Sequence, residues 1–312
     1  MASNIKITFL GTGGSVPKPG RGLPALAIHI DEVLNIFDCG EGTQKQLMKS
    51  EVSFMDISNI FISHFHADHF LGLPGLLDTL SFSGRTDDLN IYGPEGAIKF
   101  VKKITELGYG RLNFNVNIHE LEPGKSYNFK KFYIKTLKAN HPVPSLSYSI
   151  EEMDIIKIDK NLVDKIKFPV YKLEELRNNG ELTINDKKYS INDVAMGIKK
   201  GRKIVYSGDT RPSESMIEFS KNADVLIHDT TMDSSMEPMV NQYGHTSARQ
   251  AAIIAKKANV KKLFLFHYSQ RFTDLGILLN DAKSEFNNSF LSHELLSYDV
   301  PKITKIINLS SR

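Results

Sequence analysis

A cluster of histidine and aspartate residues follows a short apolar segment near residue 60. Residues 59–63 are typical of a buried strand, and His64, His66, Asp68 and His69 come after it in a His-x-His-x-Asp-His pattern. Three histidines at these spacings should arise by chance only ~0.01 times in a chain of this composition. Because alternate side chains can converge on one point while the last pair turns toward another, we interpret the motif as metal-binding.

The available ligand types indicate a catalytic site rather than a closed structural one. The chain has a single cysteine, Cys39, so it contains neither an intramolecular disulfide nor a Cys-x-x-Cys zinc site. Imidazole nitrogens and carboxylate oxygens are the ligands of catalytic zinc, which keeps an open coordination position. Four candidates facing two ways suggest two ions, whose remaining ligands are expected at the ends of other strands.

Three downstream residues meet this expectation. His141 follows Leu137-Lys138-Ala139-Asn140, Asp209 lies in Tyr206-Ser207-Gly208-Asp209-Thr210, and His267 directly follows the apolar residues 263–266. Each of the three ends a predicted strand. A single His or Asp at such a place can equally be a cap or a buried hydrogen-bonded group. The three therefore have to be judged together with their neighbours.

The apolar pattern predicts a mixed α/β protein. Strands are expected at residues 5–10, 26–30, 33–37, 59–63, 127–137, 146–150, 203–207, 225–228 and 262–266. Helices are expected at residues 43–49, 74–80, 213–221 and 247–258. We expect two sheets packed face to face with helices outside. Residues 160–185 show no strong period, and we interpret them as part of a protruding insertion.

Composition adds limits on compartment and partners. The 312 residues are 41% hydrophobic and 24% charged, as in an ordinary globular protein. No secretory signal or segment of ~18 apolar residues is evident, so we expect a cytoplasmic protein without a membrane partner. The net charge of +3 is too small to argue for nucleic-acid binding. Residues 157–203, however, hold twelve Lys/Arg against seven Asp/Glu, which is either a solvated face or a surface for a polyanion.

Several motifs, taken in order, resemble those of ribonuclease Z in the metallo-β-lactamase superfamily. They are His64-Phe65-His66-Ala67-Asp68-His69, His141-Pro142, Ser207-Gly208-Asp209-Thr210-Arg211-Pro212 and His267-Tyr268-Ser269-Gln270-Arg271-Phe272. Residues 9–13 and 38–44 are similar to that family too. The first motif alone is typical of the whole superfamily, but the combination of all four motifs is typical of a much smaller group of proteins within it. The resemblance implies an α/β, four-layer αββα metallo-β-lactamase sandwich over residues 1–312, with an inserted arm at about 155–200.

The resemblance also implies a ligand set of two Zn²⁺ per subunit. One ion would be held by His64, His66 and His141. The other would be held by Asp68, His69 and His267, and Asp209 would bridge the two ions. Asp68 would in addition accept the proton of the attacking water. The activity implied is a zinc-dependent endoribonuclease that removes the 3′ trailer from precursor tRNA and leaves a 3′-hydroxyl on the tRNA. The family also implies a homodimer in which the arm of one subunit holds the tRNA.

His245 is the candidate general acid for the departing 3′-oxygen. It precedes a predicted helix that opens with hydroxyl residues, where free N–H groups attract phosphate, although a His that merely caps the helix is the alternative. Asp229 stands where the family commonly has a Glu that orients this acid. Thr246, Ser269 and Arg271 are candidate substrate contacts, with a structural salt bridge as the other interpretation of Arg271.

Two other functions remain open at this stage. Another hydrolase of the same fold, a phosphodiesterase or an aryl-sulfatase, is possible because such a site selects reaction type better than substrate. An RNA-binding protein with an inactive site is disfavoured because all seven ligands are present. The glycines of residues 11–14 favour a tight turn over a phosphate cradle. Residues 168–173 lack the Gly/Pro-rich tip of bacterial arms, which suggests a shorter or helical tip.

Overall fold

The computed structural model describes residues 4–108 and 110–308, which form two compact units. Residues 4–151 and 203–301 make up the larger unit, and residues 152–202 with 302–308 make up the smaller one. None of the helices within these described ranges is long and apolar enough to cross a membrane. Each unit is built around its own apolar core.

The first sheet of the larger unit has seven strands. Their order is β20 (Ser297–Asp299), β1 (Ile5–Gly11), β3 (Ala25–Ile30), β4 (Val33–Phe37), β5 (Ile57–Phe61), β6 (Leu89–Gly93) and β7 (Val116–Glu120). Strands β4 to β7 are parallel, so the chain must cross over between them. Much of this crossing is made by α1 (Thr43–Lys49), α3 (Leu73–Phe82) and α4 (Ala97–Thr105).

The second sheet also has seven strands. Their order is β19 (Ser289–Leu291), β17 (Leu263–Phe266), β16 (Val225–Asp229), β15 (Lys203–Tyr206), β10 (Leu146–Glu152), β9 (Phe132–Lys138) and β8 (Ser126–Asn128). Its helices are α7 (Glu214–Ser220), α8 (Glu237–Gln242), α9 (Ala248–Lys257) and α10 (Gly276–Lys283). A capping box between Ser247 and Gln250 starts α9. The larger unit also contains the single turns η1 (Phe54–Asp56) and η4 (Ser234–Met236).

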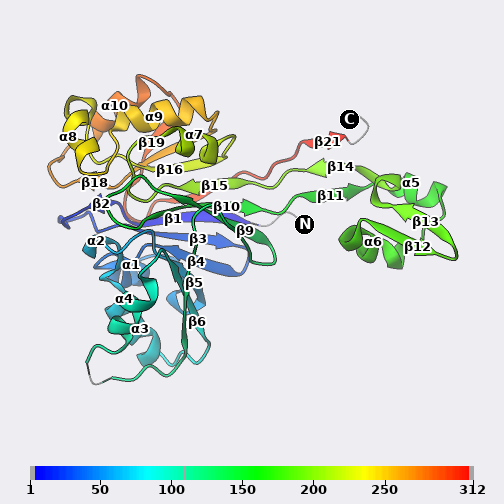
Figure 1. Cartoon of the computed structure of the whole chain (residues 1–312), viewed down its shortest axis with the longest axis horizontal. Helices are drawn as coiled ribbons and strands as arrows, with labels where there is room; N and C mark the ends of the chain where they lie inside the picture. Colours follow the sequence, from blue (N-terminus) through cyan, green and yellow to red (C-terminus); the bar gives the residue numbers. More distant parts are fainter. Residues whose placement is uncertain (1–3, 109, 309–312) are drawn as a thin grey trace. The chain divides into compact units, whose positions relative to one another are not determined.

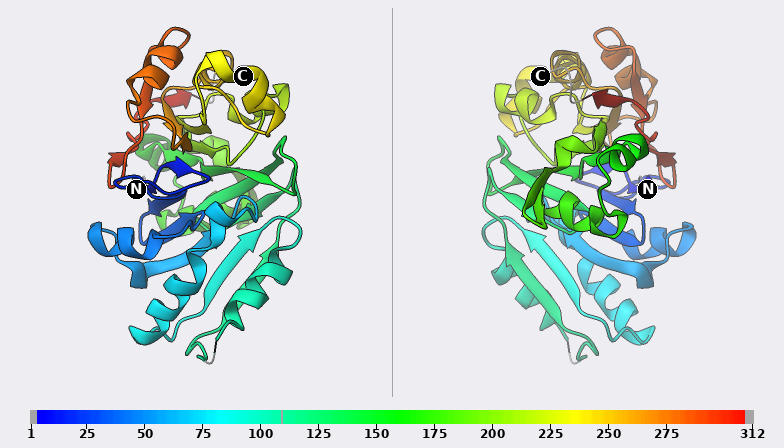
Figure 2. Two further views of the ribbon diagram at one scale, coloured as in Figure 1. Left: turned by 90° about the vertical axis from the view of Figure 1, so that its left-hand side faces the viewer. Right: turned by 90° about the vertical axis from the view of Figure 1, so that its right-hand side faces the viewer.

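Three apolar cores hold these layers together. Large side chains such as Phe9, Phe61, Tyr148 and Phe266 fill the space between the two sheets. A second core lies under α1 and α3, and a third lies under α7, α9 and α10. Figures 1 and 2 show the helices on the two outer faces of the paired sheets in the larger unit. The predicted four-layer αββα fold is confirmed.

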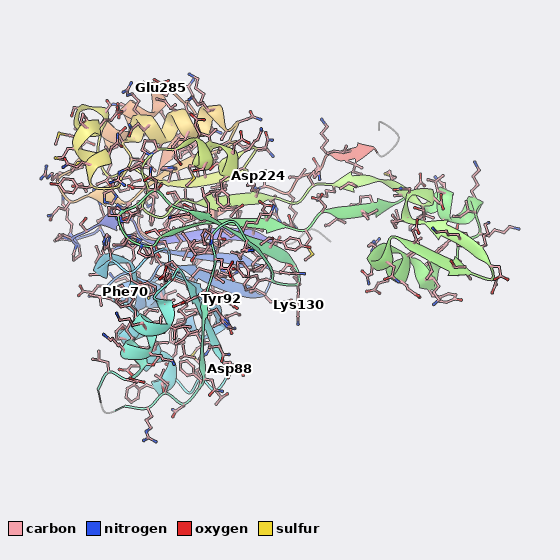
Figure 3. The ribbon with its side chains drawn as sticks, viewed as in Figure 1. Phe70, Asp88, Tyr92, Lys130, Asp224 and Glu285 are labelled. Atoms are coloured by element: carbon pink, nitrogen blue, oxygen red, sulfur yellow. The ribbon has the colours of Figure 1, made fainter. Side chains whose placement is uncertain are left out.

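One predicted strand was wrong in its extent. Residues 127–137 form the hairpin β8–β9 instead of a single strand, with Lys130 at the turn in the left-handed region at φ 66°. Asn128 accepts a hydrogen bond from the Lys130 backbone N–H through its side chain at 2.9 Å, which stabilises such a turn. Lys130 is labelled in Figure 3. The apolar residues on both sides of this turn gave the segment the appearance of one continuous strand.

The smaller unit contains a three-stranded antiparallel sheet and a small α/β layer. The sheet is β11 (Ile155–Ile158), β14 (Ala195–Lys199) and β21 (Ile306–Asn308), and the hairpin is β12 (Glu181–Ile184) with β13 (Lys187–Ser190). The helical segments are α5 (Lys160–Lys165), η2 (Val170–Lys172), α6 (Leu173–Asn179) and η3 (Ile191–Asp193). These helices are too short to give residues 160–185 a readable period.

Candidate metal centre

The seven candidate ligands lie together although they come from four separate places in the chain. They all follow strand ends: β5, β9, β15 and β17. The short helix α2 (Ala67–Phe70) turns the chain after His66, so that Asp68 and His69 face a different point from His64 and His66. The structure brings all seven into two adjoining groups: His64, His66, His141 and Asp209; and Asp68, His69 and His267.

The first group is compact. His66 Nδ1 lies 3.0 Å from His64 Nε2 and 3.3 Å from His141 Nε2. Asp209 Oδ2 lies 3.6 Å from His64 Nε2. All four ligand atoms lie within 4.8 Å of one another, the arrangement expected around a single ion.

The second group shares Asp209 with the first. Asp68 Oδ2 lies 3.6 Å from His69 Nε2 and 3.4 Å from His267 Nε2. Asp209 reaches the same two rings, with Oδ2 at 3.3 Å from His69 Nε2 and Oδ1 at 3.4 Å from His267 Nε2. Its carboxylate therefore lies between the two groups.

Buried atoms without partners support cation binding at this place. His69 Nε2, His267 Nε2 and Asp209 Oδ1 are buried and, among the described residues, have no hydrogen-bond partner. Leaving such atoms unsatisfied is costly. Metal ions bound by these imidazole and carboxylate atoms would remove that cost. The residues present therefore fit the metal ions that their side-chain types predict.

Asp38 orients two of the histidines from behind, and the sequence motifs assign it no role. Its Oδ2 lies 2.8 Å from His69 Nδ1 and accepts hydrogen bonds from the hydroxyls of Ser63 and Tyr206 at 2.8 and 2.6 Å. The Ser63 hydroxyl in turn lies 3.0 Å from His64 Nδ1. Such partners fix the tautomer that presents Nε2 to a metal. The signal that could have found Asp38 is its place in the segment 38–44 that resembles the family.

Two glycines allow the other histidines to approach closely. A Cβ on Gly14 would lie 2.3 Å from Cε1 of His267, and one on Gly244 would lie 2.7 Å from Nδ1 of His141. The carbonyl of Gly244 lies 3.0 Å from His141 Nδ1, and the Thr231 hydroxyl lies 3.0 Å from His267 Nδ1. The glycines near residue 14 thus serve this close approach, through the short pairing of β2 (Gly13–Gly14) with β18 (Tyr268–Ser269).

Burial and the neighbouring charges shift the pKa values of these ligands in different directions. Burial lowers the pKa of His64 and His141 and keeps these rings neutral. Burial would raise the pKa of Asp209, but the nearby His267 and His69 hold it well below its usual range. Burial would likewise lower the pKa of His69, yet the charges of Asp209, Asp38 and Asp68 raise it well above normal. A bound cation would replace the proton on this last ring.

His245 lies beside the second group, between α8 and α9. Its Nδ1 is 2.9 Å from Asp229 Oδ2 and 3.7 Å from Asp209 Oδ2. Burial lowers the pKa of His245, but the charges of Asp229 and Asp209 outweigh it and raise that pKa to about 9. The ring stacks on that of His267, with centroids 5.2 Å apart. A protonated imidazole therefore stands at the edge of the ligand groups.

The three candidate substrate contacts differ in their exposure. Arg271 is exposed, and its backbone N–H donates to the hydroxyl of Ser269 at 3.3 Å. Thr246 is buried, and its hydroxyl donates to the Thr210 carbonyl at 2.6 Å, so it binds another loop of the protein. All three remain predictions as substrate contacts. His228 is buried, with Nδ1 2.8 Å from the Asp229 carbonyl oxygen.

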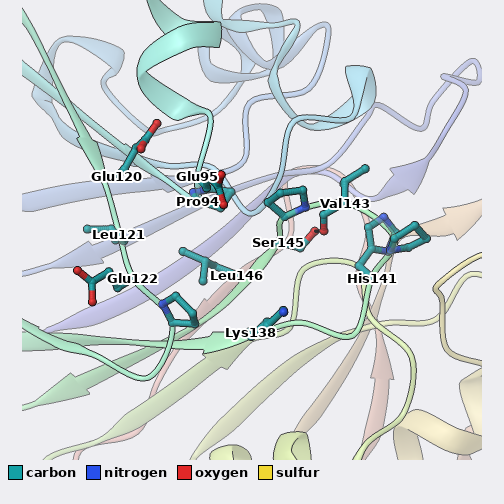
Figure 4. A pocket seen from close by; sticks show the side chains of 13 residues that line it. Pro94, Glu95, Glu120, Leu121, Glu122, Lys138, His141, Val143, Ser145 and Leu146 are labelled. Carbon is teal, nitrogen blue, oxygen red and sulfur yellow. Dashed lines mark hydrogen bonds between the residues drawn. The ribbon is translucent and has the colours of Figure 1, made fainter.

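A cavity of about 500 Å³ opens beside His141. Figure 4 shows its lining, in which Leu121 and Leu146 provide apolar walls and Lys138 supplies an amino group. This volume is within the range of small-molecule pockets. A small molecule in this cavity would therefore touch His141.

Family comparisons agree with the fold and the ligand groups. Residues 173–268 match the model described as the beta-lactamase superfamily domain, and residues 5–168 match the model described as anti-Pycsar protein Apyc1. Together with the four-layer sandwich and its His/Asp groups at strand ends, the first of these matches defines a protein of the metallo-β-lactamase fold.

Whole-chain relatives narrow this class. The chain is 60% identical over 309 residues to the ribonuclease Z of Picrophilus torridus, covering 99% of this chain and 100% of that protein. It is 56% identical over 300 residues to the ribonuclease Z of Thermoplasma acidophilum, covering 96% and 98%. The crystal structure of human tRNase Z, short form, matches with a TM-score of 0.70 and 29% identity, covering 95% and 99%. The chain belongs to the ribonuclease Z family and is an endoribonuclease.

Proposed function

We propose that this enzyme removes the 3′ trailer of precursor tRNA by hydrolysing one phosphodiester bond, and that it leaves a 3′-hydroxyl on the tRNA. The observation that carries the proposal is the pair of ligand groups that share Asp209. Identity of 56–60% to proteins named ribonuclease Z and likeness to a human tRNase Z support tRNA as the substrate. The proposal also places the activity of the enzyme in the cytoplasm.

The metal ions are two Zn²⁺ per subunit. His64, His66 and His141 would hold one ion, Asp68, His69 and His267 would hold the other, and Asp209 would contribute to both from its place between the two groups. When bound, the two ions neutralise the phosphate oxygens and lower the pKa of the attacking water toward neutrality. Asp68 accepts the proton of that water. The Ser15 backbone N–H donates to Asp68 Oδ2 at 2.7 Å and holds this carboxylate in place.

His245 completes the reaction as the general acid. The leaving 3′-alkoxide has a high pKa and needs a proton as the bond to phosphorus breaks. The raised pKa of His245, to about 9, keeps this ring protonated at neutral pH. Asp229 positions the ring through Nδ1 and leaves Nε2 to donate the proton.

Substrate binding uses further residues of this subunit and of a second one. Arg271 and Ser269 contact the terminal nucleotides or their phosphates, whereas the buried Thr246 contributes by holding its loop in place. The arm, at about 155–200, binds the body of the tRNA. The enzyme works as a homodimer in which the arm of one subunit serves the site of the other.

Cleavage of a trailer-bearing precursor tRNA, with both product ends mapped, tests this function. A mature tRNA ending in a 3′-hydroxyl and a trailer beginning with a 5′-phosphate are expected. Zinc analysis of the purified protein should find two ions per chain. Hydrolysis of a small phosphodiester or an aryl sulfate without any cleavage of precursor tRNA would instead support another hydrolase of the same fold.

A further inference from the structure

Arg211 lies between three loops of the candidate metal centre. It is neither one of the candidate metal ligands nor the proposed general acid, so its role is still unexplained. It follows Asp209 by two residues, in the segment Ser207-Gly208-Asp209-Thr210-Arg211-Pro212. Its side chain is half-buried. The role of a guanidinium at this position must therefore come from the groups that it touches.

The guanidinium donates hydrogen bonds to carbonyl oxygens of two other loops. Nη1 lies 3.4 Å from both the backbone and the side-chain carbonyl oxygens of Asn140. Nε donates to the Asn241 carbonyl, and Nη2 donates to the Gln242 carbonyl at 2.8 Å. Asn241 and Gln242 are the last two residues of α8, and the Asn241 carbonyl also accepts from the Gly244 backbone N–H at 3.1 Å.

The backbone around Arg211 strengthens the same connection. The Arg211 N–H donates to the Asn140 carbonyl at 3.0 Å. The Asn140 N–H donates to the Thr210 hydroxyl at 3.0 Å, and the Thr246 hydroxyl donates to the Thr210 carbonyl at 2.6 Å. Residues 210 and 211 are therefore tied to the residue before His141 and to the residue after His245.

These hydrogen bonds converge on one ligand and one proton donor. His141 comes directly after Asn140, and its Nδ1 lies 3.0 Å from the carbonyl of Gly244. Gly244 and His245 follow the end of α8, which Arg211 holds through Asn241 and Gln242. A shift of this turn would move the acceptor that orients His141 and, at the same time, the ring of His245.

We infer that Arg211 is a positioning residue, which ties the loop of His141 to the loop of His245 so that metal binding and proton donation depend on one shared clamp. The inference rests on the proposed roles of these two histidines. It assigns Arg211 no contact with the RNA and no part in the bond-breaking step.

The geometry of the clamp requires arginine. Carbonyl oxygens of Asn140, Asn241 and Gln242 accept from three different nitrogens of one planar group. Arginine presents five N–H donors in a fixed fork, whereas lysine has a single ammonium on a flexible stem. Lysine at 211 would keep the charge but could hold the two loops together only weakly.

The test compares R211Q and R211K with the parent enzyme in two independent measurements. The first is the dissociation constant of Zn²⁺ from each protein, obtained by chelator competition starting from metal-free protein. Loss of a residue that orients a ligand typically weakens metal affinity by ~10–100-fold, and we expect both variants to fall in this range. The second is kcat and KM on precursor tRNA, where kcat should fall and KM should change little.

A cycle with H245A separates positioning from general loss of stability. If Arg211 acts through His245, R211Q should cost much less turnover in the H245A background than in the parent enzyme. Equal costs in both backgrounds, or parental zinc affinity in both R211Q and R211K, would overturn the inference. If R211Q does not fold, R211K alone decides by the same comparison.

Arg249 offers a matched control at the other end of α8. Its guanidinium pairs with Glu237, the first residue of that helix, with Nη2 2.9 Å from Oε2. R249Q should keep the parental zinc affinity and kcat, and equal losses in R249Q and R211Q would also overturn the inference. H141A and H245A test the proposed function separately: if either retains full activity, the proposed function fails, whereas their loss beside an unaffected R211Q contradicts only the role of Arg211.

Discussion

His245 and Asp229 form a direct contact, with Nδ1 2.9 Å from Oδ2. The family commonly has a longer Glu at this position, and the structure shows that the shorter side chain still reaches the ring. It does so from the last residue of β16, where Oδ1 also accepts from the hydroxyl of Thr231 at 2.7 Å. The missing methylene therefore does not separate Asp229 from the proposed acid, His245.

Replacement D229N tests this support. An amide can donate to His245 Nδ1 and no longer stabilises a charged ring, so the proton donor is weakened. We expect kcat on precursor tRNA to fall by as much as the ~10²–10⁴-fold that a general acid contributes. D229E, which retains the carboxylate, is the matched control and should keep most of the activity. Equal activity of D229N and D229E would mean that the charge at this position is unimportant.

H245A should retain both metal ions yet lose ~10²–10⁴-fold in turnover on precursor tRNA. The loss depends on the leaving group, because a nitrophenolate needs no proton to depart. On bis(p-nitrophenyl) phosphate the same variant should therefore lose little. Metal analysis together with the two rates checks this prediction. A large and equal loss on both substrates would instead point to a role in binding or folding.

H141A should abolish cleavage and lower bound metal, because the first ligand group loses one of its four members. Atomic spectroscopy after dialysis measures the metal, and precursor tRNA cleavage measures the activity. His293 is exposed, so H293A is the control and should match the parent enzyme. Full zinc content with normal activity in H141A would remove His141 from the site.

Much of this site can be predicted from the sequence, and the reason is geometric. His64, Asp209 and His267 follow apolar strands, and strand ends in a sandwich converge, so residue type and position are sufficient to bring them together. Asp38 cannot be predicted in this way, because its role depends on a left-handed φ of 55° and on partners far away in the chain. The hydrogen bonds of Arg211 cannot be predicted either, because most of them go to backbone carbonyl oxygens, which every residue type has.

Gly14 belongs to a segment whose glycines favour a turn, and its approach to His267 leads to a prediction. In G14A the new Cβ would lie 2.3 Å from the His267 ring, so either the ring or the strand pair β2–β18 must shift. We expect weaker zinc binding and loss of cleavage. At Gly22, in the same loop, the nearest atoms would be 3.7 Å from a new Cβ, so G22A should behave like the parent enzyme. Unchanged zinc affinity in G14A would show that the loop adapts without cost.

The smaller unit carries the last prediction, and its structure decides where to cut. Replacing residues 157–185 would remove two of the four residue pairs between β11 and β14 and would delete β12 while leaving its partner β13. Replacing residues 159–194 with a short Gly/Ser linker keeps the final pair, Ile158 with Ala195, and removes the whole small core around Phe168. This variant should therefore fold, because the larger unit has its own cores.

The replaced segment has seven basic and seven acidic residues. The positive excess of residues 157–203 therefore comes from the residues on either side of this segment. Some acidic groups inside it are already paired, as Glu175 is with Lys172 and Glu181 with Lys188, whereas Lys165 and Lys167 are exposed. We expect the linker variant to bind precursor tRNA more weakly and with a flatter salt dependence, by about one unit of slope for each phosphate that is no longer neutralised. Hydrolysis of a small phosphodiester should be unchanged, because the proposed metal ligands lie outside the segment.

K165Q/K167Q should reproduce part of the salt effect in an otherwise intact arm. If both variants process precursor tRNA like the parent enzyme at every salt concentration, this segment is a solvated surface and the tRNA is held elsewhere.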